Sequence, residues 1–93
     1  MIPCRFRRDA LPDALRYFTE CAGLRLFGRG AWRSAICVFH DDSRPSLRVN
    51  VATGAYRCMA CGARGGDVLD FHRARHGLSF AQAARDLGAW RTA

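Results

Sequence analysis

Four potential metal ligands, arranged in two pairs, constrain this chain more than any other feature. Two residues separate Cys37 from His40, and Cys58 and Cys61 repeat that spacing. A two-residue gap lets a tight turn present both side chains of a pair to one ion. The 17 residues between His40 and Cys58 have the pattern of a β-hairpin, which folds the second pair back beside the first. The spacing predicts one zinc ion bound by Cys37, His40, Cys58 and Cys61.

The predicted ion is structural rather than catalytic, because four protein ligands leave no coordination position for water or substrate. An iron–sulfur cluster is a competing interpretation, although such clusters usually take four cysteines. The other alternative is that Cys37 and Cys58 are small buried hydrophobic residues and His40 a surface histidine. Gly62, directly after the last ligand, favours the metal, since glycine lets the chain turn sharply around an ion.

The remaining cysteines and histidines give no second predicted site. Five cysteines without an export signal argue against a disulfide framework. Cys21 is interpreted as a packing residue beside the first predicted helix, and Cys4 as a free thiol. His72 and His76 lie four apart, a spacing that can chelate a metal, but the sequence places no third ligand beside them. We expect them to be solvated or to face phosphate.

The chain is strongly basic. All 15 of its basic residues are arginines, they outnumber eight acidic residues, and the formal net charge is +7. Three thiolates and one Zn²⁺ lower that charge by only one. Such a charge attracts polyanions, although it does not say which polyanion. A codon bias toward arginine and alanine is the alternative explanation.

The length fits a single domain, which we expect to span residues 9–93 behind a basic N-terminal arm at residues 1–8. No apolar run approaches the length of a membrane span, and the first ten residues lack the apolar core of a signal peptide. We therefore expect a cytoplasmic protein with no membrane partner.

The predicted elements begin with a helix after Asp9. Its apolar positions recur three and four residues apart and form one face, which consists of Leu11, Leu15, Phe18 and Ala22. Gly23 is placed to end this helix.

Two β-hairpins are predicted to follow. The first spans residues 24–36, with a turn at Gly28-Arg29-Gly30. The second has cleaner alternation, because Leu47, Val49 and Val51 alternate with polar residues before a turn at Thr53-Gly54.

Two short helices complete the predicted α+β fold, which contains a small antiparallel sheet. Asp67 is placed to cap a helix that Gly77 ends. Ser79 and Gln82 form a capping box for a second helix, which ends at Gly88.

A basic face is predicted on the sheet. If Leu47 and Val49 face the core, Arg48 points outward, and Arg57 has the opposite parity to Tyr56. The arginine guanidinium can pair with phosphate and stack on an unpaired base. The candidate DNA-binding residues are Arg33, Arg44, Arg48, Arg57 and Arg64, with Trp32 and Tyr56 as stacking platforms. The alternatives are a solvated face for the arginines and core positions for both aromatic residues.

With these motifs in place, the sequence resembles the N-terminal zinc-binding domain of bacterial and phage DNA primases, a Cys-His-Cys-Cys zinc ribbon. The matching motifs are Gly28-Arg29, Cys37-x2-His40, Pro45-Ser46, Val49, Tyr56, Cys58-x2-Cys61-Gly62, Gly65-Gly66-Asp67 and the GLSFAQAARDL segment. The resemblance covers nearly the whole chain from about Asp9. Val38 stands where the family usually has proline, and Leu47 and Met59 stand where it often has aromatic residues. These replacements keep hydrophobicity.

The resemblance implies a module that binds single-stranded DNA in priming or replication initiation. In primases a catalytic domain with clustered metal-binding carboxylates follows, whereas Asp41-Asp42 is the only adjacent carboxylate pair here. We therefore expect no enzymatic activity from this chain alone and a separate partner, a primase, polymerase or helicase, as in a plasmid, phage or other mobile element. A protein-interaction adaptor or regulator is the alternative function, and a fragment of a longer primase is a third interpretation.

Overall fold

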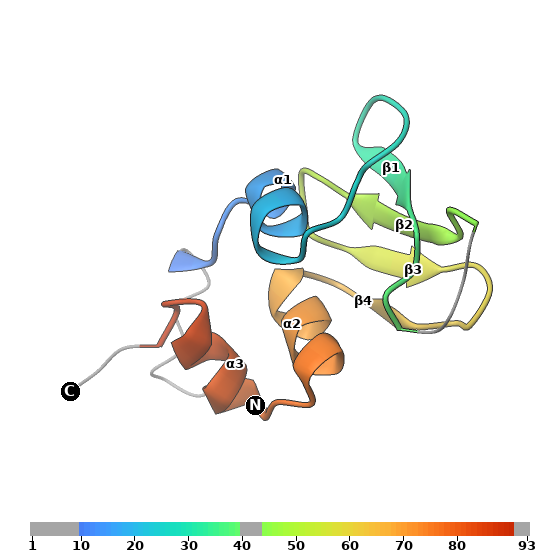
Figure 1. Ribbon diagram of the computed structural model, residues 1–93. Coiled ribbons are helices and arrows are strands. Elements are labelled where there is room, and N and C mark those ends of the chain that lie inside the picture. The colour runs from blue at the N-terminus through green and yellow to red at the C-terminus, as the bar shows by residue number, and fades with distance from the viewer. Residues whose placement is uncertain (1–9, 40–43, 91–93) are drawn as a thin grey trace.

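The computed structural model describes residues 10–39 and 44–90. The expected arm at residues 1–8, Cys4, His40 and the Asp41-Asp42 pair lie outside the described residues. In chain order the elements are α1 (Ala14–Arg16), η2 (Tyr17–Cys21), β1 (Trp32–Ala35), β2 (Leu47–Asn50), β3 (Tyr56–Cys58), β4 (Arg64–Gly65), α2 (Val68–His76) and α3 (Phe80–Asp86). The predicted α+β class is confirmed: one helical segment, a four-stranded antiparallel sheet, then two helices (Figure 1).

The sheet has the strand order β1-β2-β3-β4, and every neighbouring pair is antiparallel. The predicted hairpin between β2 and β3 is confirmed. Leu47 and Val49 are fully buried and Arg48 is exposed, as strand alternation requires. The Asn50 side chain accepts hydrogen bonds from two backbone N–H groups of the turn, and Gly54 adopts a φ of +85°. The fourth strand, β4, has only two residues and was not predicted.

The predicted hairpin over residues 24–36 forms only in part. Phe27 and Ser34 exchange backbone hydrogen bonds of 2.8 and 2.9 Å as an isolated bridge, so residues 24–31 form no strand. Gly28 and Gly30 adopt φ values of +102° and +80°, which turn the chain twice and allow only this one pair. β1 instead forms its ladder with β2, where Ala35 lies opposite Leu47.

The first helical segment does not bury the set of residues that was predicted. α1 is one turn capped by Asp13, and it continues directly into η2, where the N–H of Ala22 bonds to the carbonyl of Tyr17, five residues back. This wider π-type turn changes the phase of the helix. As a result Tyr17 and Phe18 are both buried, while Leu15, expected inside, is 38% exposed.

The C-terminal helices follow their predicted boundaries. The Asp67 carboxylate caps α2 by accepting from the N–H of Asp70 at 2.9 Å, and Gly77 ends the helix in the left-handed region. Ser79 and Gln82 form both bonds of the capping box at the start of α3. Local sequence signals therefore fix both helices.

An aromatic cluster joins the helices to the sheet. The fully buried ring of Phe71 in α2 meets the rings of Tyr17, Phe18, Phe39 and Tyr56, with centroids 5.0–5.9 Å away. Edge-on packing of this kind adds to the hydrophobic contribution of burial. The cluster thus holds η2, the segment after β1, and β3 around one side chain.

α3 packs against α2 through a second, smaller core in which Leu69 contacts Ala83 and Ala84. Figure 1 shows α3 at one end of the molecule and the sheet at the other, with α2 between them. Within the described residues α2 is the longest helix, at nine residues, and no helix there has the length and apolar character needed to cross a membrane.

Candidate metal centre

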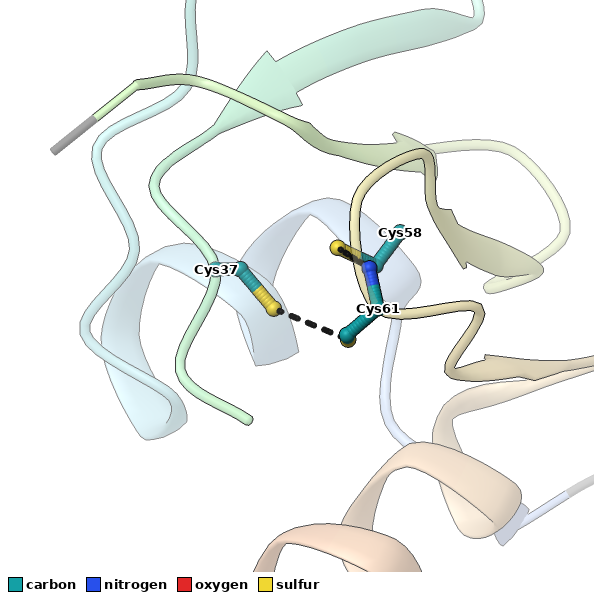
Figure 2. Close-up of side chains that lie close together, drawn as sticks. All are labelled: Cys37, Cys58 and Cys61. Atoms are coloured by element: carbon teal, nitrogen blue, oxygen red, sulfur yellow. Dashed lines mark hydrogen bonds between the residues drawn. The ribbon is translucent and has the colours of Figure 1, made fainter. Parts of the chain in front are cut away.

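Three cysteines converge beside the sheet. Cys37 follows β1, Cys58 is the last residue of β3, and Cys61 lies in the turn after β3. Figure 2 shows the three side chains pointing toward one another, and their Sγ atoms all lie within 4.8 Å of each other. The Sγ atoms of Cys37 and Cys61 are 4.0 Å apart. The spacing of the sequence motif and the geometry of the fold therefore identify the same three residues.

The turn between the last two cysteines is held by backbone hydrogen bonds. The N–H of Gly62 donates to the carbonyl of Cys58 at 3.1 Å, and the N–H of Cys58 donates to Ala63 at 2.7 Å. Gly62 has a φ of +78°, which other residues rarely adopt, so the predicted sharp turn at this glycine is confirmed. The N–H of Cys61 points at the sulfur of Cys58, 3.4 Å away. The turn thus stabilises negative charge on that sulfur.

Two further groups support the sulfur atoms. The N–H of Phe39 donates to the Sγ of Cys37 at 3.4 Å, repeating the arrangement in the other turn. The Ser46 hydroxyl lies 3.6 Å from the Sγ of Cys58. Ser46 could not be recognised as part of the site from the sequence, because nothing local indicates that the residue before β2 lies beside Cys58.

Without a metal ion, the surroundings of Cys37 favour its neutral thiol over the thiolate. The pKa of the Cys37 thiol is raised to about 12, mainly by burial and also by nearby Cys58 and Cys61, against the lowering effect of the Phe39 N–H. A bound metal reverses this preference, because a coordinating thiol is deprotonated.

The sulfur positions fit zinc. Zinc–sulfur bonds of about 2.3 Å in tetrahedral geometry put sulfur atoms roughly 3.8 Å apart, close to the 4.0 Å between Cys37 and Cys61. Soft thiolates are also the donors that structural zinc sites use. His40 lies outside the described residues, and its role as fourth ligand stays a prediction.

Three of the predicted DNA-binding arginines form a row across the sheet. Arg48 in β2 lies directly opposite Arg57 in β3, and Arg57 lies opposite Arg64 in β4. All three are exposed. We refer to Arg48, Arg57 and Arg64 as the arginine row.

The other two predicted arginines lie elsewhere. Arg33 is opposite Val49, which places it on the core-facing side of β1, and its Nε donates to the carbonyl of Gly30 at 3.1 Å. Arg44 is exposed in the segment before β2. Neither residue therefore belongs to the arginine row.

The two predicted stacking residues differ in exposure. Trp32 is 44% exposed and lies opposite Asn50, hence on the same face of the sheet as Arg48. Tyr56 is only 3% exposed, and its ring stacks on that of Phe39. Tyr56 is therefore a core residue. Its prediction as a stacking platform is wrong, because its ring is covered.

The predicted exposure of His72 and the predicted burial of Cys21 are both wrong. His72, expected to be solvated, is 8% exposed, with Nδ1 2.7 Å from the hydroxyl of Tyr17 and Nε2 against the carboxylate of Asp86. Cys21, expected to pack inside, is exposed. The π-type turn buries Tyr17 and Phe18 and leaves Cys21, at its end, exposed.

Known proteins resemble this chain over the same region. The family model described as CHC2 zinc finger matches residues 22–92. The Gene 58 protein of Mycobacterium phage D29 is 41% identical over 54 residues, which cover 58% of this chain and 41% of that protein. The DNA primase of Thermotoga maritima is 38% identical over 75 residues, or 81% of this chain and 13% of the primase. The chain therefore spans less than half the length of these relatives.

A solved structure agrees. The crystal structure of the zinc-binding and RNA polymerase domains of the Aquifex aeolicus primase matches with a TM-score of 0.69 and 28% identity, covering 83% of this chain and 18% of that chain. Residues 22–92, which the family model matches, contain the three converging cysteines. The family motif together with this cluster implies one bound zinc ion. The chain belongs to the CHC2 zinc finger family, the zinc ribbon of DnaG-type primases.

Proposed function

We propose that this chain is a zinc-dependent module that binds single-stranded DNA in priming or replication initiation, together with a separate replication protein that supplies catalysis. The family and the relatives named DNA primase support this context. The observation that carries the proposal is the arginine row on the outer face of the sheet.

The arginine row is costly unless an anion neutralises it. Neighbouring strands lie about 4.8 Å apart, so the three side chains start close together, and like charges directly opposite in a sheet are destabilising. Among the described residues none forms an ion pair with Arg48, Arg57 or Arg64. A phosphate backbone lying across the row supplies the missing negative charge.

Trp32 favours a single strand over a duplex. It is diagonal to Arg48 on the same face, so an aromatic ring and a guanidinium lie within reach of adjacent nucleotide units. A single strand exposes the faces of its bases for stacking, whereas a duplex does not.

Zinc contributes by fixing the positions of two members of the arginine row. Arg57 directly precedes Cys58, and Arg64 follows the turn that carries Cys61. The metal therefore sets the register between β3 and β4. We include His40 in this proposal as the fourth zinc ligand, in line with the Cys-His-Cys-Cys pattern.

The test is binding of the zinc-loaded protein to single-stranded and duplex oligonucleotides over a salt series. We expect log affinity for single strands to fall with log salt by about 0.7 per phosphate contacted. Arg48→Ala and Arg57→Ala should each lower that slope by about 0.7 and leave the zinc content unchanged. Arg85→Ala is the control for loss of one charge, because Arg85 lies on α3, where its guanidinium packs over the ring of Trp90. Equal effects of all three variants would refute a defined site.

A protein-interaction adaptor is the second candidate function. An apolar groove of about 420 Å³ beside β1 is lined by Gly23, Leu24, Arg25, Phe27, Ile36 and Val38. Phe27 and Ile36 are 42% and 38% exposed, which gives a partner an apolar surface to cover. No binding to any oligonucleotide at low salt would favour this candidate over DNA binding.

A further inference from the structure

A pocket lies at the β4 edge of the sheet, between β4 and α2, and Arg64 is the one member of the arginine row that lines it. It has a volume of about 460 Å³, within the range of small-ligand sites, and is lined by Tyr56, Arg64, Asp70, Arg73, Ala74, Gly77 and Leu78. Arg64 is the last member of the row, and Arg73 belongs to α2. The pocket therefore brings a helix arginine beside the sheet arginines.

The balance of charge in this pocket is positive. Arg64 and Arg73 are both exposed, and Asp70 is the one carboxylate among the lining residues. One oxygen of Asp70 accepts from the N–H of Gly66 at 2.9 Å, which holds that carboxylate against the backbone. Two guanidinium groups thus face one anchored carboxylate, and the space between them is open to solvent.

Arg73 keeps donors available for a ligand. Its Nε lies 3.5 Å from the carbonyl of Leu78, at the limit of a hydrogen bond, and its guanidinium carbon is 5.8 Å from the centroid of the Phe80 ring. These contacts use only one of the five N–H groups of Arg73, which lines the pocket.

We propose that Arg73 forms a phosphate subsite that extends the arginine row from the sheet onto α2. A single DNA strand then runs from Trp32 along Arg48, Arg57 and Arg64 and places one further phosphate between Arg64 and Arg73. Charge-assisted hydrogen bonds from two guanidinium groups outweigh the weaker effect of the negative end of the α2 dipole. This inference rests on the proposed function and deepens it, because it specifies which residues the bound strand contacts and where the last phosphate lies.

The helix supplies a matched control two residues away. Asp70, Arg73, Ala74 and Gly77 are spaced three or four apart and form the pocket face of α2. Arg75 is also exposed, but it follows Phe71 by four residues and His72 by three, so it lies on the side of α2 that packs against Tyr17. Arg75→Ala therefore removes the same charge from the same helix without touching the path.

The experiment measures binding of zinc-loaded wild type, Arg57→Ala, Arg73→Ala and Arg75→Ala to oligothymidylates of about 4 and about 12 nucleotides, a range that brackets usual site sizes. With the longer oligonucleotide, Arg73→Ala should lower the salt slope by about 0.7, as Arg57→Ala does, and Arg75→Ala should not. With the shorter one, the effect of Arg73→Ala should disappear while that of Arg57→Ala remains. Arg73→Lys should keep the slope.

Two results overturn the inference. If Arg57→Ala lowers the slope and Arg73→Ala behaves like Arg75→Ala, the proposed function stands and the subsite on α2 is wrong. If wild type binds neither oligonucleotide at low salt, the subsite and the proposed function both fail. Zinc content and far-UV circular dichroism of each variant distinguish loss of the subsite from loss of the fold, since Arg73 also contacts the carbonyl of Leu78.

Discussion

The hydroxyl of Tyr17 lies 2.7 Å from Nδ1 of His72, although 55 positions separate the two residues in sequence. The opposite ring nitrogen, Nε2, contacts the carboxylate of Asp86. One buried imidazole therefore joins η2, α2 and α3. Because both of its nitrogens have partners, His72 satisfies the requirement that a buried polar group be hydrogen-bonded.

Tyr17→Phe should destabilise the domain by about 1–3 kcal/mol, because it leaves Nδ1 of His72 buried without a partner. Tyr56→Phe is the matched control. Its hydroxyl donates to the Asp70 carbonyl over a longer 3.4 Å, so its loss should cost less. Urea unfolding of the zinc-loaded proteins gives both values, and equal losses would show that the imidazole contact has no special weight.

Cys58→Ala should abolish stoichiometric zinc binding, since Cys58 is buried among the converging sulfur atoms. Cys21→Ala removes an exposed thiol outside that cluster and should retain one zinc ion per chain. Metal analysis of the purified variants measures this directly. Zinc retained by the Cys58 variant would contradict the assignment.

Zinc affinity should rise with pH between about pH 6 and 8. The pKa of the Cys37 thiol is raised to about 12, so in the metal-free protein this thiol carries a proton throughout that window, and zinc must displace it. Lowering the pH by one unit should therefore weaken binding about tenfold through Cys37 alone. Chelator competition at several pH values measures the slope. Zinc uptake that releases no proton in weak buffer would disprove this account.

Gly65→Ala should destabilise the fold by about 1–3 kcal/mol through overpacking. A Cβ atom there would lie 2.5 Å from the Tyr56 ring and 2.7 Å from the Cβ of Asp70. Gly66→Ala is the neighbouring control, since its Cβ would meet only an Asp70 oxygen at 3.8 Å. Thermal unfolding should separate the two variants by several degrees, and a Gly65 variant as stable as wild type would contradict the packing argument.

Local patterns made much of this fold predictable. The alternation at Leu47 and Val49 gave β2, and the cap at Asp67 and the capping box at Ser79 gave the two C-terminal helices. The three sulfur ligands were also predictable, because short spacing and an intervening hairpin determine which side chains meet. Such signals act over a few residues, so the sequence displays them directly.

Distant contacts account for what could not be predicted. The inward position of Tyr17 depends on Phe71 and His72, far along the chain. β4 has only two residues, one of them glycine, so strand propensity does not predict it. The strand can form because Gly65 has no side chain and fits against the ring of Tyr56. The line of Arg48, Arg57 and Arg64 depends on the register of three strands, which spacing alone does not set.

The two edges of the sheet bear on how the protein behaves at high concentration. An open sheet edge is a template on which other chains can pair, and long unprotected edges lead to aggregation. Here β4 offers only two residues, and on β1 the backbone N–H and carbonyl of Ser34 are already bonded to Phe27. Both edges of this small sheet thus offer few free backbone groups to a further strand, so we expect little aggregation through edge-to-edge pairing.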